Sequence, residues 1–243
     1  MAGVYISYPF CEQKCTYCNF ASGVFPRSLV DAYLDALVAE IERRPPEWIP
    51  ETLYLGGGTP SSMDTGWLAR ILDRLAGRPW PEATLEAAPG TITAEKARAW
   101  RDVGINRISL GVQSFVAGEL ARTGRRHTAE TVDADVARLR AAGIKNFNID
   151  LIAGLPGQSD ASWRESLDWV ERLEAPHVSV YMLEVDDDSR LGREILRGGE
   201  RYGAGSIPGE DLTAELYETA VERLARLGLR RYEISNFARP GRE

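Results

Sequence analysis

The sequence predicts an α/β fold: a partial TIM-type barrel of six βα units, (β/α)6, whose sheet is open on one side. Short runs rich in β-branched residues alternate with longer segments of helical periodicity, which is the pattern of a parallel sheet covered by helices. The connections are brief, and no break in composition precedes residue 186, which favours one barrel. A chain of 243 residues, 44% of them hydrophobic, is long enough to bury one large core.

The first half of the chain is expected to form three βα units. Each strand is a short apolar or β-branched run, and each helix has apolar residues at helical spacing, as at Leu34, Leu37 and Ile41. A pair of prolines follows the first helix and ends it, and Thr93 is suited to cap the third. The predicted segments are, in order, strand Val4–Tyr8, helix Asp31–Arg44, strand Thr52–Leu55, helix Thr65–Ala76, strand Thr84–Ala87 and a helix from Thr93 to Gly104.

The second half is expected to add three more units of the same kind. Gly143 ends the helix of the fourth unit, and the pattern becomes irregular after the sixth strand. The stretch Asp186–Gly209 has three consecutive aspartates and several glycines, so we expect a solvated loop, with a lid that faces a substrate as the alternative. The predicted segments are strand Arg107–Leu110, helix Glu130–Ala142, strand Phe147–Leu151, helix Ala161–Leu173, strand Val178–Met182, helix Asp211–Leu227 and strand Tyr232–Ile234.

Composition and charge exclude several classes of protein. The net charge of -7 and the pI near 5.1 argue against nucleic acid as a partner, because a phosphate-binding surface needs clustered Lys and Arg. No run of about 18 apolar residues is present, which argues against a membrane span. The N-terminus has no basic region followed by a cleavage site, so we expect a soluble cytoplasmic protein.

The three cysteines lie within eight residues, with the spacing C-x3-C-x2-C from Cys11 through Cys15 to Cys18. An odd number at this spacing is a poor disulfide framework but a good ligand set. The motif directly follows the first strand, at the mouth of the barrel where such folds place their sites. Cys thiolates hold iron–sulfur clusters, and a cubane with three Cys ligands keeps one iron without a protein ligand. A Cys3His zinc site is the alternative, although His127 and His177 do not stand at a usual short spacing.

Several motifs together resemble the radical S-adenosylmethionine (SAM) proteins, in the branch similar to oxygen-independent coproporphyrinogen III oxidase that also contains the HemW-type heme chaperones. The resemblance runs from Val4 to Gly241. It implies the radical SAM core barrel, a 4Fe–4S cluster held by Cys11, Cys15 and Cys18, and SAM on the open iron. Together the motifs are far more specific than one glycine-rich turn. They are, in the order of the family, YISYPFC, LYLGGGTPS, TLEAAPG, RISLGVQSF, NIDLIAGLPGQ and YEISNFARPG.

The resemblance also implies that nine residues contact SAM. Glycine permits positive φ and close approach of the backbone, so exposed amide and carbonyl groups of the glycine turn are expected at the methionine end of SAM. We expect Asp150 to accept from ribose hydroxyls and Glu86 to meet a charged or hydroxyl-bearing part of the cofactor. The alternatives are an ordinary turn for the glycines and plain packing for the two tyrosines. The nine residues are Tyr5, Tyr17, Gly57, Gly58, Thr59, Glu86, Gln113, Arg125 and Asp150.

Two features favour the chaperone branch over the oxidase branch. The oxidases are expected to carry a fourth cysteine two positions after the third, but here Cys18 is followed by Asn19 and Phe20. The oxidases also usually have a sizeable segment before the first strand, which this chain enters by Gly3. The main interpretation is therefore a HemW-like heme chaperone involved in heme delivery, and the alternative is an oxidase-type radical SAM enzyme of porphyrin biosynthesis. Whether the protein cleaves SAM as an enzyme stays open.

The resemblance divides the chain into a core barrel over 1–209 and a final helix and strand over 210–243 that lead to a further C-terminal domain. In the family, a histidine-containing heme motif would begin just beyond Glu243, so heme is expected in the full-length protein. The implied partners are SAM, heme or porphyrin, an electron donor and a heme-accepting protein.

Overall fold

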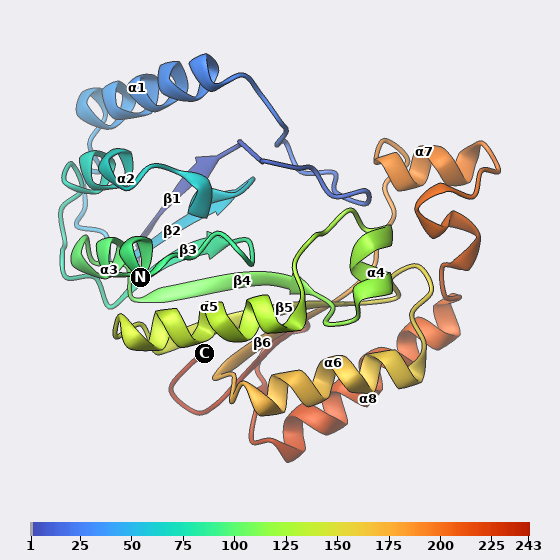
Figure 1. Cartoon of the computed structure of the whole chain (residues 1–243). Coiled ribbons are helices and arrows are strands. Elements are labelled where there is room, and N and C mark those ends of the chain that lie inside the picture. The colour runs from blue at the N-terminus through green and yellow to red at the C-terminus, as the bar shows by residue number, and fades with distance from the viewer. Residues whose placement is uncertain (1) are drawn as a thin grey trace.

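Residues 2–243 are described by a computed structural model, and they form an eight-stranded sheet wrapped by helices (Figure 1). The strand order is β1-β2-β3-β4-β5-β6-β8-β7. The first six strands are parallel, and β8 pairs antiparallel with both β6 and β7. Because β1 and β7 stand at the two ends of this order, the sheet is an open, partial barrel, as predicted.

The six predicted βα units are confirmed, and their bounds differ by a few residues at most ends. The strands are β1 (Gly3–Tyr8), β2 (Thr52–Gly57), β3 (Glu82–Ala87), β4 (Arg107–Gln113), β5 (Asn146–Ala153), β6 (His177–Met182), β7 (Arg230–Arg231) and β8 (Asn236–Ala238). The helices are α1 (Arg27–Arg43), α2 (Thr65–Leu72), α3 (Ala94–Asp102), α4 (Ala117–Arg122), α5 (Ala129–Ala141), α6 (Asp160–Arg172), α7 (Arg190–Leu196) and α8 (Glu210–Arg226), with 3-10 turns at Pro60–Ser62 and Arg201–Ser206.

Side chains alternate along the strands between an apolar outer layer and a polar interior. The apolar set, which includes Leu55, Leu85 and Ile149, is fully buried and belongs to one hydrophobic core. The polar set lines a cavity inside the barrel, with Glu86 and Asp150 among its members. Successive residues of a strand point to opposite faces, so each strand contributes to both layers. The barrel interior is therefore a polar site rather than the packed core of a closed barrel.

Local signals explain where the helices begin. The side chain of Thr93 accepts from the N–H of Lys96 at 3.1 Å, which confirms it as the cap of α3. Helices α5 and α6 start with reciprocal capping boxes at Thr128 and Ser159. Gly143 follows α5 with φ of 86°, a conformation that suits glycine and stops the helix.

Two sequence predictions are wrong at the C-terminal end. The stretch Asp186–Gly209 is not all loop, because it contains α7 and a 3-10 turn; Ser189 caps α7, accepting from the N–H of Gly192 at 2.9 Å. The predicted strand Tyr232–Ile234 is instead the turn between β7 and β8, where the N–H of Asn236 bonds back to Glu233 O at 3.3 Å.

Three smaller differences lie elsewhere in the chain. Helix α1 begins at Arg27, four residues before the predicted start, because Pro26 sets an extended entry. Helix α2 ends at Leu72 rather than Ala76, where tighter turn bonds replace the helical ones. The short helix α4 was not predicted at all.

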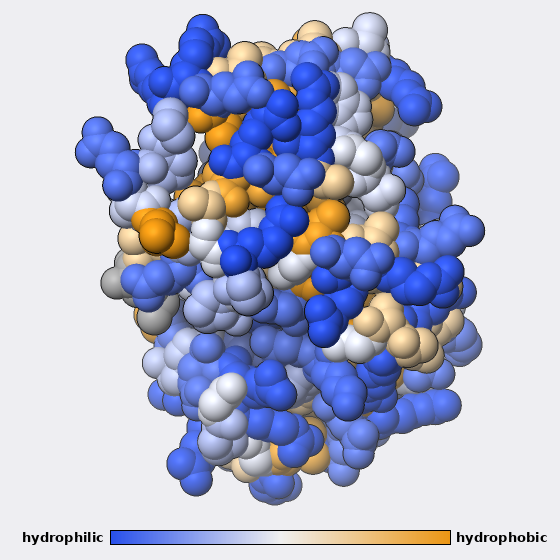
Figure 2. All heavy atoms as spheres, turned by 90° about the vertical axis from the view of Figure 1, so that its left-hand side faces the viewer, coloured by the Kyte–Doolittle hydropathy of each residue, from blue (hydrophilic) through white to orange (hydrophobic). Residues whose placement is uncertain are grey.

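Within residues 2–243, no helix is both long and apolar enough to cross a bilayer. The face drawn in Figure 2 is largely hydrophilic, with hydrophobic residues gathered in its upper half, where α1 and α2 lie.

Candidate cofactor site

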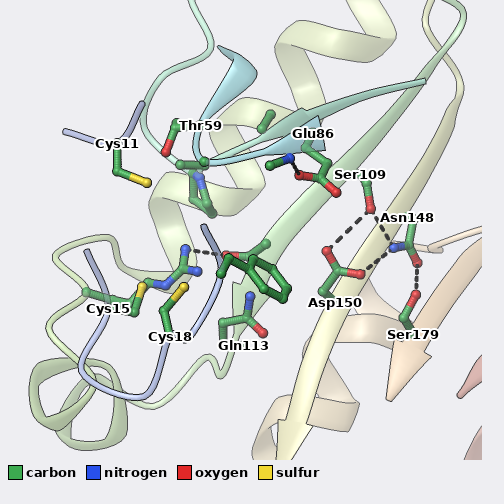
Figure 3. Close-up of a pocket in the computed structure, with 18 of the residues that line it drawn as sticks. Cys11, Cys15, Cys18, Thr59, Glu86, Ser109, Gln113, Asn148, Asp150 and Ser179 are labelled. Atoms are coloured by element: carbon green, nitrogen blue, oxygen red, sulfur yellow. Dashed lines mark hydrogen bonds between the residues drawn. The ribbon is translucent and has the colours of Figure 1, made fainter. Parts of the chain in front are cut away.

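The cysteine motif lies in the loop that follows β1, at the carboxyl end of the parallel strands. The N–H of Cys11 donates to Gly23 O at 2.8 Å, and the N–H of Gly23 donates to Pro9 O at 2.9 Å, so the loop is closed at its base. Figure 3 shows the sulfur atoms of Cys11, Cys15 and Cys18 gathered on one side of the pocket, with Gln113 beside Cys18 and Asp150 on the other side. The predicted placement at the barrel mouth is thus realised.

The three thiols fit an iron–sulfur cluster by their chemistry and setting. All three are unpaired and half-buried. Burial raises the pKa of the Cys18 thiol, and the nearby Cys15 and Cys11 act in the same direction, which shows that the three share one space. Among the described residues, no three His, Cys, Asp or Glu side chains could hold a single metal ion. A cluster differs in this respect, since its thiolates are spread around a body of several irons.

Two short helices that the sequence did not predict hold the cysteine loop in place. Thr16, which is buried, donates its N–H to Thr123 O at the end of α4 (3.1 Å) and accepts at its own carbonyl from the N–H of Leu191 in α7 (2.8 Å). Arg190 of α7 also donates to the carbonyl of Lys14. The loop is therefore anchored from both sides between Cys15 and Cys18, and Figure 1 shows it next to α4 and α7.

The glycine turn after β2 uses its amides inside the protein. The N–H of Gly57 donates to Glu86 Oε2 at 3.0 Å, that of Gly58 to Tyr8 O at 2.7 Å, and that of Thr59 to Phe10 O at 2.8 Å. The expectation that amides of this turn are exposed to a ligand is therefore wrong, although Gly57, Gly58 and Thr59 all line the cavity. The glycines serve another purpose: Gly57 has φ of 117°, and Gly58 lets the turn lie against the cysteine loop.

Glu86 ties this turn to the neighbouring strand. Its Oε1 accepts from the Tyr54 hydroxyl at 2.9 Å, and its Oε2 accepts from Gly57. Burial raises the pKa of Glu86, while these two hydrogen bonds act to lower it. Each carboxylate oxygen keeps lone pairs beyond these bonds, so Glu86 orients the turn and can still accept from a ligand.

Asp150 lies in the middle of β5 rather than at its end, and a polar network surrounds it. Its Oδ1 accepts from Asn148 Nδ2 at 2.7 Å, and its Oδ2 accepts from the Ser109 hydroxyl at 3.3 Å. Burial raises the pKa of Asp150, and the hydrogen bonds from Asn148 and Ser109 oppose that rise. The dashed lines of Figure 3 trace this network across β4, β5 and β6.

Arg125, Tyr17 and Gln113 line the cavity together with the three cysteines. Arg125 Nη1 donates to Gly111 O at 2.7 Å, while its buried Nε has no partner. Burial acts to lower the pKa of Arg125, but Tyr17 and Cys15 raise it, so the guanidinium stays charged. Gln113 ends β4 at a break in register, with φ of 73°, a conformation that is uncommon outside glycine.

The three cysteines and all but one of the expected SAM contacts line a single cavity of about 890 Å³. Tyr5 is the exception: it is 61% exposed on the edge strand and stacks on Tyr54, with ring centroids 5.7 Å apart. Sequence reasoning missed Tyr54, Ser109, Asn148, His177 and Ser179, which line the same cavity. The sequence did contain an indication of these residues, because polar residues alternate with apolar ones on these strands and so share the face that lines the interior.

Both histidines of the chain are neutral and engaged with the protein. His127 Nε2 lies 3.1 Å from Val112 O, and His177 lies within 2.8 Å of Asn148 and Tyr232. Burial lowers the pKa of each histidine to about 4. An unfolded histidine titrates near 6.5, so between these values the unfolded chain binds protons that the folded chain does not.

Stability should therefore fall as the pH drops from 6.5 toward 4. The expected slope is up to about 1.4 kcal/mol per pH unit for each histidine. The buried carboxyls with raised pKa values act in the opposite sense at the acid end. Denaturant unfolding at pH 7 and pH 5 measures the difference, and equal midpoints would contradict it.

Comparisons with known proteins agree with this geometry. The model of the Radical SAM superfamily matches residues 5–170. The heme chaperone HemW of Lactococcus lactis is 37% identical over 98% of this chain, and a mitochondrial radical S-adenosyl methionine domain-containing protein 1 of Bos taurus is 33% identical over 99%. This chain spans 62% and 55% of the lengths of those two relatives.

The solved structures extend the likeness to the fold. Coproporphyrinogen III oxidase (HemN) of Escherichia coli, described as a radical SAM enzyme, has a TM-score of 0.88 at 26% identity, covering 99% of this chain and 56% of that one. The radical SAM methyltransferase TsrM of Kitasatospora setae shares the fold at a TM-score of 0.59 and 16% identity, covering 81% of this chain and 39% of its own. From the matched residues, the parallel barrel and the cysteine loop at its mouth, the chain belongs to the radical SAM superfamily.

Proposed function

We propose that this chain binds a 4Fe–4S cluster through Cys11, Cys15 and Cys18, binds SAM in the adjoining barrel cavity, and is the radical SAM part of a heme chaperone. Its superfamily implies a 4Fe–4S cluster and SAM as cofactors. The observation that carries the proposal is the gathering of three free thiols at the mouth of a polar cavity of about 890 Å³. Bound together, the cluster and SAM would supply one-electron reductive chemistry.

The residues of the chain would divide the work of holding SAM. Asp150 would accept from ribose hydroxyls, since an ionised carboxylate only accepts. The carbonyls of the glycine turn and the Thr59 hydroxyl would accept from the amino group of the methionine end, because the amides are already used. Arg125, charged and with one buried N–H free, would donate to the carboxylate of SAM beside the thiols.

The chaperone role is supported by relatives named heme chaperone HemW at 31–37% identity. The second candidate is an oxidase-type radical SAM enzyme of porphyrin biosynthesis, supported by the fold of HemN. The residue two positions after Cys18 is Phe20, so this chain lacks the additional cysteine expected of the oxidases. Heme or porphyrin, an electron donor and a heme-accepting protein are the partners that we propose for the whole protein.

We further propose that 1–209 forms the core barrel and that 210–243 leads to a C-terminal domain. Helix α8 already packs on the barrel, because Leu216, Ala220 and Leu224 belong to the same hydrophobic core as the strands. A cytoplasmic location fits three free thiols, which persist in a reducing compartment.

Asp150→Asn is expected to weaken SAM binding by roughly tenfold, because it replaces a charged acceptor by an amide of the same size. Calorimetric titration of SAM into the anaerobically reconstituted protein measures this. A matched control is Asp160→Asn, an exposed carboxylate at the start of α6, which should bind SAM as the native protein does. Native affinity in Asp150→Asn would remove this residue from the proposed SAM site.

Hemin is expected to bind this chain only weakly, without a histidine ligand on the iron. His177 uses both ring nitrogens in hydrogen bonds, and His127 bonds to Val112 O, so ligation of either would break a buried contact. Titration of hemin should show no sharp one-to-one Soret change, and His127→Ala and His177→Ala should leave the spectrum as it is. A stoichiometric complex abolished by either substitution would place the heme site on the barrel.

A further inference from the structure

We propose that Asn148 and His177 are positioning residues: they form a directed hydrogen-bond relay that holds Asp150 ionised and fixes the orientation of its carboxylate toward SAM. The proposal rests on the proposed role of Asp150 in SAM binding. It adds Asn148 and His177, which are not among the nine expected SAM contacts. It also assigns one orientation to the Asn148 amide and one tautomer to the His177 ring.

The relay runs across three strands and the C-terminal turn. Tyr232 Oη lies 2.8 Å from His177 Nε2, and His177 Nδ1 lies 2.7 Å from Asn148 Oδ1. Asn148 Nδ2 donates to Asp150 Oδ1 at 2.7 Å and to Ser109 Oγ at 2.8 Å. The Ser109 hydroxyl then donates to Asp150 Oδ2 at 3.3 Å. Both oxygens of the carboxylate thus receive a hydrogen bond from the same small network.

With Asp150 ionised, one arrangement of protons satisfies every bond. An ionised carboxylate is an acceptor only, so Asn148 must turn its NH2 toward Asp150 and its carbonyl oxygen toward His177. That oxygen needs a donor, so the proton of the neutral imidazole is on Nδ1. Nε2 is then an acceptor and takes the Tyr232 hydroxyl proton. Each donor therefore points along the chain of bonds toward Asp150.

His177 decides which end of the Asn148 amide faces Asp150. Ser179 Oγ lies 3.2 Å from Asn148 Oδ1, but it lies closer, at 2.9 Å, to Asn236 Oδ1. Its single proton can serve only one of them. Without the Nδ1–H of His177, the amide could turn over and place its oxygen against the carboxylate, which would repel it.

The charges around Asp150 make this relay necessary. Arg107 is the nearby cation that stabilises the ionised form, while Asp150 and Glu86 disfavour each other's negative charge. Asp150 has no ion pair within 4.0 Å among the described residues. A buried carboxylate without a close cation stays ionised only if neutral donors stabilise it. Asn148 and Ser109 are those donors, and His177 holds Asn148 in place.

The first test measures the protonated nitrogen of each ring. The chain has two histidines, so the ¹⁵N spectrum of the histidine-labelled full chain at neutral pH resolves both. His177 should carry its proton on Nδ1. His127 is an internal control with the opposite state, because its Nε2 faces the carbonyl of Val112 and must donate. A proton on Nε2 of His177 would overturn the relay without any substitution.

The second test measures SAM affinity in variants. His177→Phe removes the donor to Asn148 and should weaken SAM binding by roughly tenfold. His177→Asn is the matched control, because its amide NH2 can occupy the place of Nδ1–H, and it should bind SAM nearly as the native protein does. Asn148→Asp, which sets two carboxylates against each other, should weaken binding at least as much as His177→Phe.

A coupling measurement separates positioning from a general loss of stability. If His177 acts through Asp150, His177→Phe should have no further effect on SAM affinity in an Asp150→Asn background. Equal tenfold losses in both backgrounds, or native affinity in a folded His177→Phe variant, would overturn the relay. Native affinity in Asp150→Asn alone would instead contradict the proposed SAM site, so the two failures are distinguishable.

Discussion

Replacing any one of Cys11, Cys15 and Cys18 by alanine is expected to abolish the iron–sulfur cluster. Each thiol is free and half-buried, and they gather at one side of the same cavity. The chain has three cysteines in all, so no spare thiolate can replace a lost ligand. A cluster held by only two cysteines, in a loop that solvent can reach, should dissociate as a whole.

Iron and sulfide content and the visible absorption after anaerobic reconstitution measure this loss. Asn19→Ala is the matched control, because Asn19 follows Cys18 in the same loop, is exposed and has no thiol. It should retain a full cluster. Full iron and sulfide content in any of the three alanine variants would show that the ligand set is wrong.

The barrel could be predicted from the sequence because each βα unit signals itself locally. Alternation of apolar strands with periodic helices needs no knowledge of distant parts of the chain. The two short helices that hold the cysteine loop, α4 and α7, could not be predicted in this way. Helix α4 has six residues and α7 seven, each with an internal glycine, so neither spans two full helical turns and the apolar spacing is too short to recognise.

The residues of the site also differ in whether a local motif reveals them. The cysteines were evident because their spacing is contained in one short motif. The roles of Asn148 and His177 depend on strand pairing, since β5 and β6 set these two residues opposite each other. The bond from Gly57 to Glu86 likewise joins residues 29 positions apart. Such contacts depend on the pairing register between neighbouring strands, which cannot be derived from a single sequence.

Gly58→Val is expected to be the most damaging substitution among the glycines that line the cavity, because Gly58 has the closest backbone approach of them. A Cβ at Gly58 would lie 2.5 Å from Phe10 O and 2.9 Å from Phe10 N. These are backbone atoms, which cannot rotate away as the end of a side chain can. The N–H of Thr59 also bonds to Phe10 O, so the shift would break a contact that joins the glycine turn to the cysteine loop.

Because Phe10 directly precedes Cys11, the added side chain should move a cluster ligand rather than block SAM alone. We expect cluster content to fall several-fold and unfolding free energy to fall by about 1–3 kcal/mol, the usual cost of overpacking. Gly118→Ala is the control: Gly118 is exposed in α4, and its added Cβ would meet only Arg122 Nη1 at 3.7 Å.

Iron content and thermal unfolding, measured on the same samples, separate the two effects. Gly57→Val is the informative comparison, because its Cβ would meet Tyr8 O at 3.1 Å, further from Cys11, and its positive φ adds backbone strain. It should lower stability and SAM affinity while it keeps more of the cluster than Gly58→Val does. A folded Gly58→Val protein with full iron content would show that the cysteine loop does not depend on this contact.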